Sequence, residues 1–238
     1  MFQTDPFALI IVLVGLSLIP FIAMIATSYL KIVVVMSLIR NALGIQSIPP
    51  NMVINALAMI LTFYIMAPVV SESWSAIVES QKAMAAKAGT SAPQTQGQGT
   101  VAHSPSTFDL SSLDLGKAGE PFRRFLSDHT APRERAFFIK TAETLWGKDG
   151  EPAAVDPESY WILLPSFCVS ELTKAFQIGF LVYLPFIAID IIVSNILLAM
   201  GMMMVSPVTI SLPFKLLLFV MVNGWTLLIQ GLVKGYIL

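Results

Sequence analysis

The sequence has few charged residues and almost no cysteine. Charged side chains make up 12% of its 238 residues, against about a quarter in a typical soluble domain. The 14 Lys and Arg are balanced by 15 Asp and Glu, which gives a net charge of −1. A chain of this charge has no positive field with which to bind nucleic acid. The single cysteine, Cys168, cannot form an internal disulfide, and its apolar surroundings predict a small core residue.

Apolar residues are abundant. They make up 55% of the chain, and the mean hydropathy is +0.76, values typical of a membrane protein or of a very large buried interface. Residues 72–158 hold nine of the 14 basic and twelve of the 15 acidic side chains. The sequence therefore divides into a hydrophobic part, a polar middle and a second hydrophobic part.

Enzyme signatures are absent. The sequence contains no HExxH, GxxxxGK or GxSxG motif. Its two histidines, His103 and His129, lie in the polar middle without ligand partners at metal-binding spacing. We expect neither an enzyme nor a bound metal or cofactor.

The first hydrophobic part (residues 1–82) is predicted to be a helical hairpin. The apolar block 7–39 is longer than the roughly 20 residues that cross a bilayer, and we expect Pro20 to kink it. Because no basic segment precedes it and no small-residue cleavage site is evident, we expect a retained helix rather than a removed signal peptide. Gly44 is a candidate for the turn that ends it, and a second helix should run from about Met52 beyond Val70, towards Glu79.

The polar middle divides in two. Residues 83–119 are rich in Ala, Gly, Ser, Gln and Pro, a composition typical of a flexible low-complexity loop. Residues 120–158 carry apolar residues at helical spacing, which predicts an amphipathic segment outside the membrane. We expect two short helices there, broken at Pro132.

The second hydrophobic part (residues 159–238) is predicted to be another hairpin. A long apolar block covers 159–204 and contains Pro165 and Pro185, and a final block runs from about Leu212 to Leu238. The predicted fold is therefore an all-α membrane protein of two long, bent helical hairpins. Four hydrophobic regions flank a polar, partly disordered central loop.

Isolated charges occur inside the apolar blocks. Glu171 and Lys174 are three residues apart and share a helix face, and Asp190 follows on the same block. Such charges are costly unless they are paired or face water. They form either a packing contact, within the chain or with another subunit, or a proton or ion relay. The packing interpretation is favoured because a relay needs a path for water. Lys31 pairs with Asp190, pairs with Glu171, or extends its amine to the membrane interface.

Three consecutive methionines, Met202, Met203 and Met204, follow Gly201 and precede Ser206-Pro207. Composition alone favours a methionine-rich helix end, since methionine fills irregular apolar gaps. A second interpretation uses their position. Gly201 permits a bend and Pro207 ends the helix, so the methionines would project from a loop. In a ring of several copies they would form a hydrophobic constriction.

Two long stretches carry the motifs of a known family in order. The motifs are RNALG, PPNM and MAPV, followed by SELTKAF, PFIAIDI and AMGMMMVSP. With them the chain resembles the FliP/SctR family, export-gate components of flagellar and virulence-associated type III secretion systems, over residues 5–82 and 120–238. Because flagellar members usually begin with a cleavable signal peptide, the chain is more similar to the injectisome branch, SctR.

The resemblance implies a pore-forming subunit that conducts unfolded proteins across the bacterial inner membrane. Its ring is expected to be pentameric, largely on the periplasmic side, and assembled with SctS/FliQ-like and SctT/FliR-like proteins. SctU/FlhB-like and SctV/FlhA-like proteins are further expected partners. The family's methionine gasket corresponds to Met202–Met204, and its charge network to Glu171, Lys174 and Asp190, with Lys31 as a further candidate. Gly44, Gly201 and Pro207 are the expected turn positions. The alternative is a small homo-oligomeric transporter or ion channel, although no inverted repeat is evident.

Overall fold

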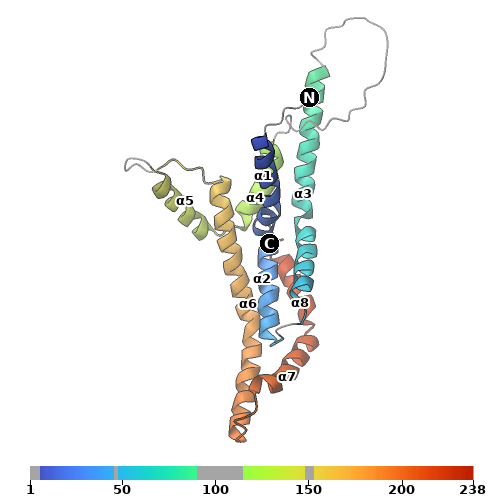
Figure 1. Ribbon diagram of the computed structural model, residues 1–238, viewed down its shortest axis with the longest axis vertical. Coiled ribbons are helices and arrows are strands. Elements are labelled where there is room, and N and C mark those ends of the chain that lie inside the picture. The colour runs from blue at the N-terminus through green and yellow to red at the C-terminus, as the bar shows by residue number, and fades with distance from the viewer. Residues whose placement is uncertain (1–5, 46–47, 90–114, 148–152, 238) are drawn as a thin grey trace, which may run out of the picture. The chain divides into compact units, whose positions relative to one another are not determined.

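The computed structural model describes residues 6–45, 48–89, 115–147 and 153–237. All regular elements in these ranges are helices (Figure 1), which confirms the predicted all-α class for the described residues. They are α1 (Pro6–Ile25), α2 (Tyr29–Ala42), α3 (Asn51–Gly89), α4 (Leu115–His129), α5 (Pro132–Trp146), α6 (Tyr160–Ala199), α7 (Pro207–Met221) and α8 (Gly224–Lys234).

The chain forms two compact units. The first comprises Met1–Met66 and Leu126–Leu238, and the second comprises Ala67–Phe125. In the first unit α2 packs along α6, α5 and α7 also pack on α6, and α8 packs on α7. In the second unit an exposed ion pair joins Arg124 to Glu72, with 3.9 Å between nitrogen and oxygen. Such exposed pairs stabilise little.

Two described helices are long and apolar enough to cross a membrane. They cover Asn51–Gln81 and Tyr160–Ala199. The number rises to four if α1 with α2, and α7 with α8, each count as one broken span. These lengths and compositions support the predicted membrane class with four hydrophobic regions.

The first hydrophobic block breaks at a different place from the one predicted. Pro20 lies inside α1, and the helix is interrupted at Ala26–Ser28 instead. The Thr27 hydroxyl donates to the Ala23 carbonyl at 2.7 Å and accepts weakly from the Tyr29 amide at 3.4 Å. Side chains of this type compete with the helical backbone for hydrogen bonds, which explains a break at Thr27-Ser28 rather than at the proline.

The final hydrophobic block is two helices rather than one. α7 and α8 meet at a bend of 59°, where Asn223 adopts the left-handed conformation with φ of 52°. Asparagine is among the few residues that tolerate this region. A side chain at Gly224 would overlap the Phe219 ring. The Asn-Gly pair is a turn signal, and we did not predict a break there.

The helices flanking the central loop reach further than expected. α3 continues to Gly89 and α4 begins at Leu115, so both enter the segment 83–119 that was predicted to be flexible. The alanines at 83, 85, 86 and 88 have the highest helix propensity of any residue, which accounts for the longer α3. Residues 90–114, with His103, lie outside the described residues.

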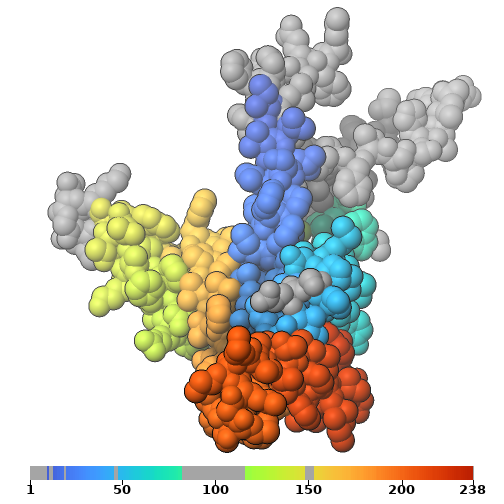
Figure 2. Space-filling model, turned by 60° about the horizontal axis from the view of Figure 1, so that its bottom comes forward, coloured from blue at the N-terminus to red at the C-terminus, as the bar shows by residue number. Residues whose placement is uncertain are grey.

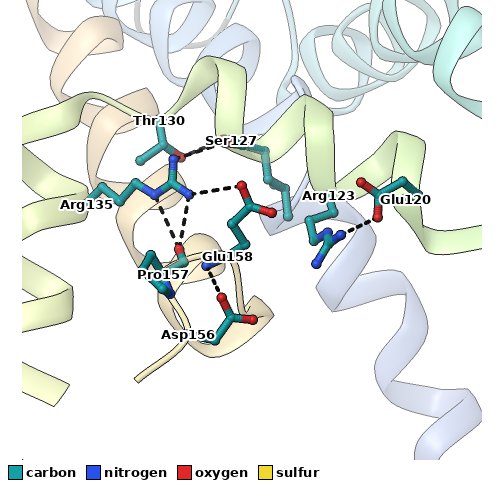
Figure 3. Close-up of polar contacts among 9 residues, drawn as sticks. Glu120, Arg123, Ser127, Thr130, Arg135, Asp156, Pro157 and Glu158 are labelled. Atoms are coloured by element: carbon teal, nitrogen blue, oxygen red, sulfur yellow. Dashed lines mark hydrogen bonds and ion pairs between the residues drawn. The ribbon is translucent and has the colours of Figure 1, made fainter. Parts of the chain in front are cut away.

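The amphipathic segment contains two helices, α4 and α5, separated at Thr130–Ala131, with Pro132 in the first turn of α5. Arg135 links this corner to the start of α6 (Figure 3). Its guanidinium donates to the Ser127 hydroxyl at 3.1 Å and to the Pro157 carbonyl at 3.2 and 3.3 Å. Ser170 of α6 accepts the Ala131 amide at 2.9 Å. These contacts join the α4–α5 corner to α6.

The apolar core lies between α2 and α6. Ile32, Val35, Met36 and Ile39 are fully buried at helical spacing on α2. They meet Ala175 and Phe186 of α6 in one cluster. Gly179 permits this close approach, since a Cβ there would overlap the Leu38 side chain. Cys168, predicted to be a small core residue, is partly buried rather than fully enclosed.

Candidate functional site

Eight charged residues lie outside the polar segment 72–158. They are Asp5, Lys31, Arg40, Glu171, Lys174, Asp190, Lys215 and Lys234. Five of these eight pair with one another in two clusters inside the first unit. We call them the Glu171 cluster (Lys31, Glu171, Lys174 and Tyr236) and the Asp190 cluster (Asp190, Ser211 and Lys215).

The Glu171 cluster is centred on a fully buried carboxylate. Lys31 Nζ lies 3.1 Å from Glu171 Oε2, with side-chain exposures of 3% and 0%. Lys174 Nζ lies 3.2 Å from the other oxygen, Oε1. The Tyr236 hydroxyl donates to Oε2. One carboxylate thus accepts from three donors that come from α2, from α6 and from the residues after α8.

The cluster has two further contacts. Lys174 Nζ donates to the main-chain oxygen of His129, the last residue of α4, at 2.7 Å. Lys31 Nζ lies 3.4 Å from the centroid of the Tyr236 ring, a distance at which a cation is attracted to the ring face. Of the partners predicted for Lys31, the structure places Glu171 beside it and Asp190 elsewhere.

Tyr236 was not predicted from the sequence. It follows α8, where nothing in the pattern of apolar residues distinguishes it. Burial raises the pKa of the Tyr236 phenol, and the negative charge of the nearby Glu171 carboxylate raises it further. The phenol therefore stays protonated at physiological pH and acts as a hydrogen-bond donor.

The Asp190 cluster joins α6 to α7. Lys215 Nζ lies 2.6 Å from Asp190 Oδ2, and the Ser211 hydroxyl donates to Oδ1 at 2.6 Å. Lys215 also donates to the Ala42 carbonyl at 3.4 Å. Its side chain is 5% exposed, whereas that of Asp190 is 34% exposed. Lys215 had no predicted partner, although a carboxylate inside an apolar block requires a cation.

The two clusters lie at opposite ends of α2. Lys31 is in its first turn, and Ala42 is its last residue. Both also involve α6, where Glu171 and Asp190 are 19 positions apart in the sequence, or about 28 Å at 1.5 Å per residue. The α7–α8 pair contributes to both, through Lys215 in α7 and Tyr236 after α8. Each cluster therefore joins α2, α6 and the α7–α8 pair.

The three methionines lie in the turn between α6 and α7, which we call the methionine turn (residues 200–206). Gly201 has a φ of +76°, and its amide donates to the Leu198 carbonyl at 3.0 Å. The next amide, that of Met202, donates to the Leu197 carbonyl at 2.9 Å. This is the hydrogen-bond pattern of a Schellman motif, which ends helices at glycine. Pro207 then starts α7.

The methionine side chains are exposed. Met203 is 82% exposed, Met204 is fully exposed and Met202 is about half exposed. The end of α6 and α7 form the orange surface at one end of the first unit (Figure 2). The turn therefore presents consecutive apolar side chains that do not pack against the chain's own core.

The other predicted turn position is Gly44. Its φ is +79°, and it follows the last turn of α2, where its amide donates to the Asn41 carbonyl at 3.0 Å. Arg40 contacts the Asn51 side chain across this turn. Within the described residues, no group of three or more His, Cys, Asp or Glu side chains is placed to hold a metal ion.

Known proteins resemble the chain over nearly its whole length. The profile of the FliP family matches residues 12–232. Yop proteins translocation protein R of Yersinia pestis is 49% identical over 98% of this chain and 97% of its own. Hypersensitivity response secretion protein HrcR of Ralstonia nicotianae is 44% identical over 96% of each chain. Virulence protein YscR of Salmonella typhimurium is 43% identical over 98% of this chain and 97% of its own. These matches confirm the resemblance found in the sequence motifs: the chain belongs to the FliP family.

Proposed function

We propose that the protein is the pore-forming subunit of a type III secretion export gate, which conducts unfolded proteins across the bacterial inner membrane. The methionine turn would act as the gasket that closes the channel between transport events. The names of the relatives, which refer to translocation, secretion and virulence, support the export part of this proposal.

One observation carries the gasket assignment. Met203 and Met204 are among the most exposed apolar side chains of the described residues, and they follow a glycine-ended helix rather than continuing it. Exposed apolar side chains that gather at one place are typical of an interaction surface. Around the axis of a ring, flexible methionines from several copies would exclude ions and separate for a polymer.

The exposed helix surfaces support assembly. Most residues of the two helical stretches that are long enough to cross a membrane, Asn51–Gln81 and Tyr160–Ala199, are not buried within the chain. Prolines also lie inside α3, α6 and α7. Proline frees backbone groups that neighbouring helices can satisfy. We propose that copies of the chain, as a pentamer, cover part of this surface. SctS/FliQ-like and SctT/FliR-like proteins would cover more, with SctU/FlhB-like and SctV/FlhA-like proteins nearby and much of the complex on the periplasmic side.

The two polar clusters favour a structural role for the charge network. Glu171 is fully buried and already accepts from Lys31, Lys174 and Tyr236. Paired groups of this kind fix how helices pack, whereas a relay needs a path for water. We therefore assign the charges to positioning the helices and the methionine turn to closing the channel.

Ion conductance tests the proposal. Replacing Met202, Met203 and Met204 by alanine should raise the ion leak of the assembled complex, because three flexible side chains are lost from the constriction. A matched control replaces three exposed apolar residues of α6 outside the turn, Phe176, Phe180 and Leu184. An unchanged leak in a correctly assembled methionine variant would contradict the gasket assignment.

A further inference from the structure

The α7–α8 pair packs unevenly against the rest of the first unit. α7 packs on α6, whereas α8 packs mainly on α7. A cavity of about 430 Å³ lies between α6 and the α7–α8 pair, lined by apolar side chains such as Val182, Phe186 and Leu228. A Cβ at Gly231, which also lines it, would meet no atom within 4 Å. Leu228 and Leu232 of α8 are buried in the apolar cluster with α2 and α6, but the cavity leaves the packing of α8 against α6 incomplete.

Polar contacts hold the two ends of the pair in addition to this apolar packing. At one end Lys215 and Ser211 of α7 bind Asp190. At the other end the Tyr236 hydroxyl donates to Glu171. The Tyr236 ring also lies under the Lys31 amine and contacts the His129 ring, with 5.1 Å between ring centroids. Tyr236 thus brings the residues after α8 into contact with α2, with α6 and with the end of α4.

We propose that Tyr236 is a positioning residue that fixes the far end of the α7–α8 pair to α6 through the Glu171 carboxylate. The hydroxyl supplies the third donor to a buried charge, and the ring covers the Lys31 amine. Because α7 starts at the methionine turn, a fixed α7–α8 pair also fixes the direction in which the turn presents its methionines. This last consequence rests on the proposed function, whereas the position of α8 does not.

Distances between spin labels test the proposal in assembled complexes where labelled chains are diluted with an excess of unlabelled Cys168→Ser chains, so that each distance is measured within one chain. Cys168→Ser removes the only cysteine, and cysteines introduced at two exposed positions then carry the labels. The first pair, Ile237→Cys with Phe176→Cys, reports the end of the pair against α6. The second pair, Met221→Cys with Ile192→Cys, reports the end of α7 against α6. All four positions are more than half exposed.

Tyr236→Phe removes the hydroxyl and keeps the ring. We expect the first label pair to lose its single narrow distance, because Glu171 no longer holds the residues after α8. The second label pair should keep its narrow distance, because Lys215 and Asp190 still fix α7. An unchanged first pair would overturn the proposal, and so would a loss of the narrow distance in both pairs.

A second background separates the hydrogen bond from simple packing. In Glu171→Met/Lys31→Met the acceptor of the Tyr236 hydroxyl and its buried counter-charge are both gone, so adding Tyr236→Phe should change the first label distance much less than it does in the native background. An equal change in both backgrounds would mean that Tyr236 acts through packing, and would overturn the proposal. The label distances do not depend on ion conductance, so their outcome is distinguishable from a failure of the gasket assignment.

Discussion

Lys31 of α2 and Glu171 of α6 form an ion pair that is almost completely removed from solvent, with 3.1 Å between Nζ and Oε2. Residues that are 140 positions apart in the sequence thereby fix α2 against α6 at the start of α2. Removing one member of such a pair leaves the other charge buried and uncompensated, which costs more than the pair itself contributes.

Glu171→Ala should therefore destabilise the protein by about 3–5 kcal/mol. The double variant Glu171→Ala/Lys31→Met should lose less than the sum of the single losses, because both charges are gone. Thermal unfolding of the purified protein in detergent measures both values. Lys174→Ala is the matched control: this side chain is 38% exposed, so its loss should cost about 1 kcal/mol or less. Strict additivity of Glu171 and Lys31 would contradict the pairing.

We expect substitutions at the two charged residues of the Asp190 cluster to cost different amounts of stability. Asp190→Asn leaves the buried Lys215 amine without its carboxylate, so the variant should lose about 3 kcal/mol or more. Lys215→Met leaves a carboxylate that is partly solvated and still accepts from Ser211, so its loss should be about 1 kcal/mol. Thermal unfolding compares the two variants. A larger loss for Lys215→Met would contradict this account of burial at the cluster.

Gly179 and Gly231 should respond differently to the same substitution. Gly179→Ala places a methyl group against Leu38 and should cost about 1–3 kcal/mol through overpacking. Gly231→Ala places it in open space within α8, where alanine favours the helix by up to about 1 kcal/mol. Unfolding measurements should also find that Leu38→Ala relieves part of the Gly179→Ala loss. Equal losses at both glycines would show that close approach of α2 and α6 is not the cause.

The sequence allowed the prediction of the helical class and the four hydrophobic regions because apolar composition and length constrain membrane helices strongly. It did not allow the correct placement of the helix breaks. Pro20 is a strong breaker in solution, yet α1 continues through it and ends at Thr27-Ser28. The Asn223-Gly224 break had a usable signal, an Asn-Gly pair inside an apolar block, which we did not use.

The candidate site was predictable in part. Glu171, Lys174 and Asp190 were identified because charges in apolar blocks need partners. Which cation serves which carboxylate depends on how α2, α6 and α7 pack, and the pattern along one helix does not contain that information. Tyr236 escaped prediction because a tyrosine among apolar residues is common, and only the fold brings its hydroxyl to Glu171.

The central claim is that the methionine turns of several copies meet around one axis. Cross-linking tests it most directly: in the Cys168→Ser background, Met203→Cys provides a single exposed thiol per chain, and Trp161→Cys, exposed to a similar extent, is the control. Mild oxidation of the complex in native membranes should link Met203→Cys chains into disulfide dimers, whereas Trp161→Cys chains stay monomeric. Met203→Cys chains that form no more dimer than the control would contradict the account.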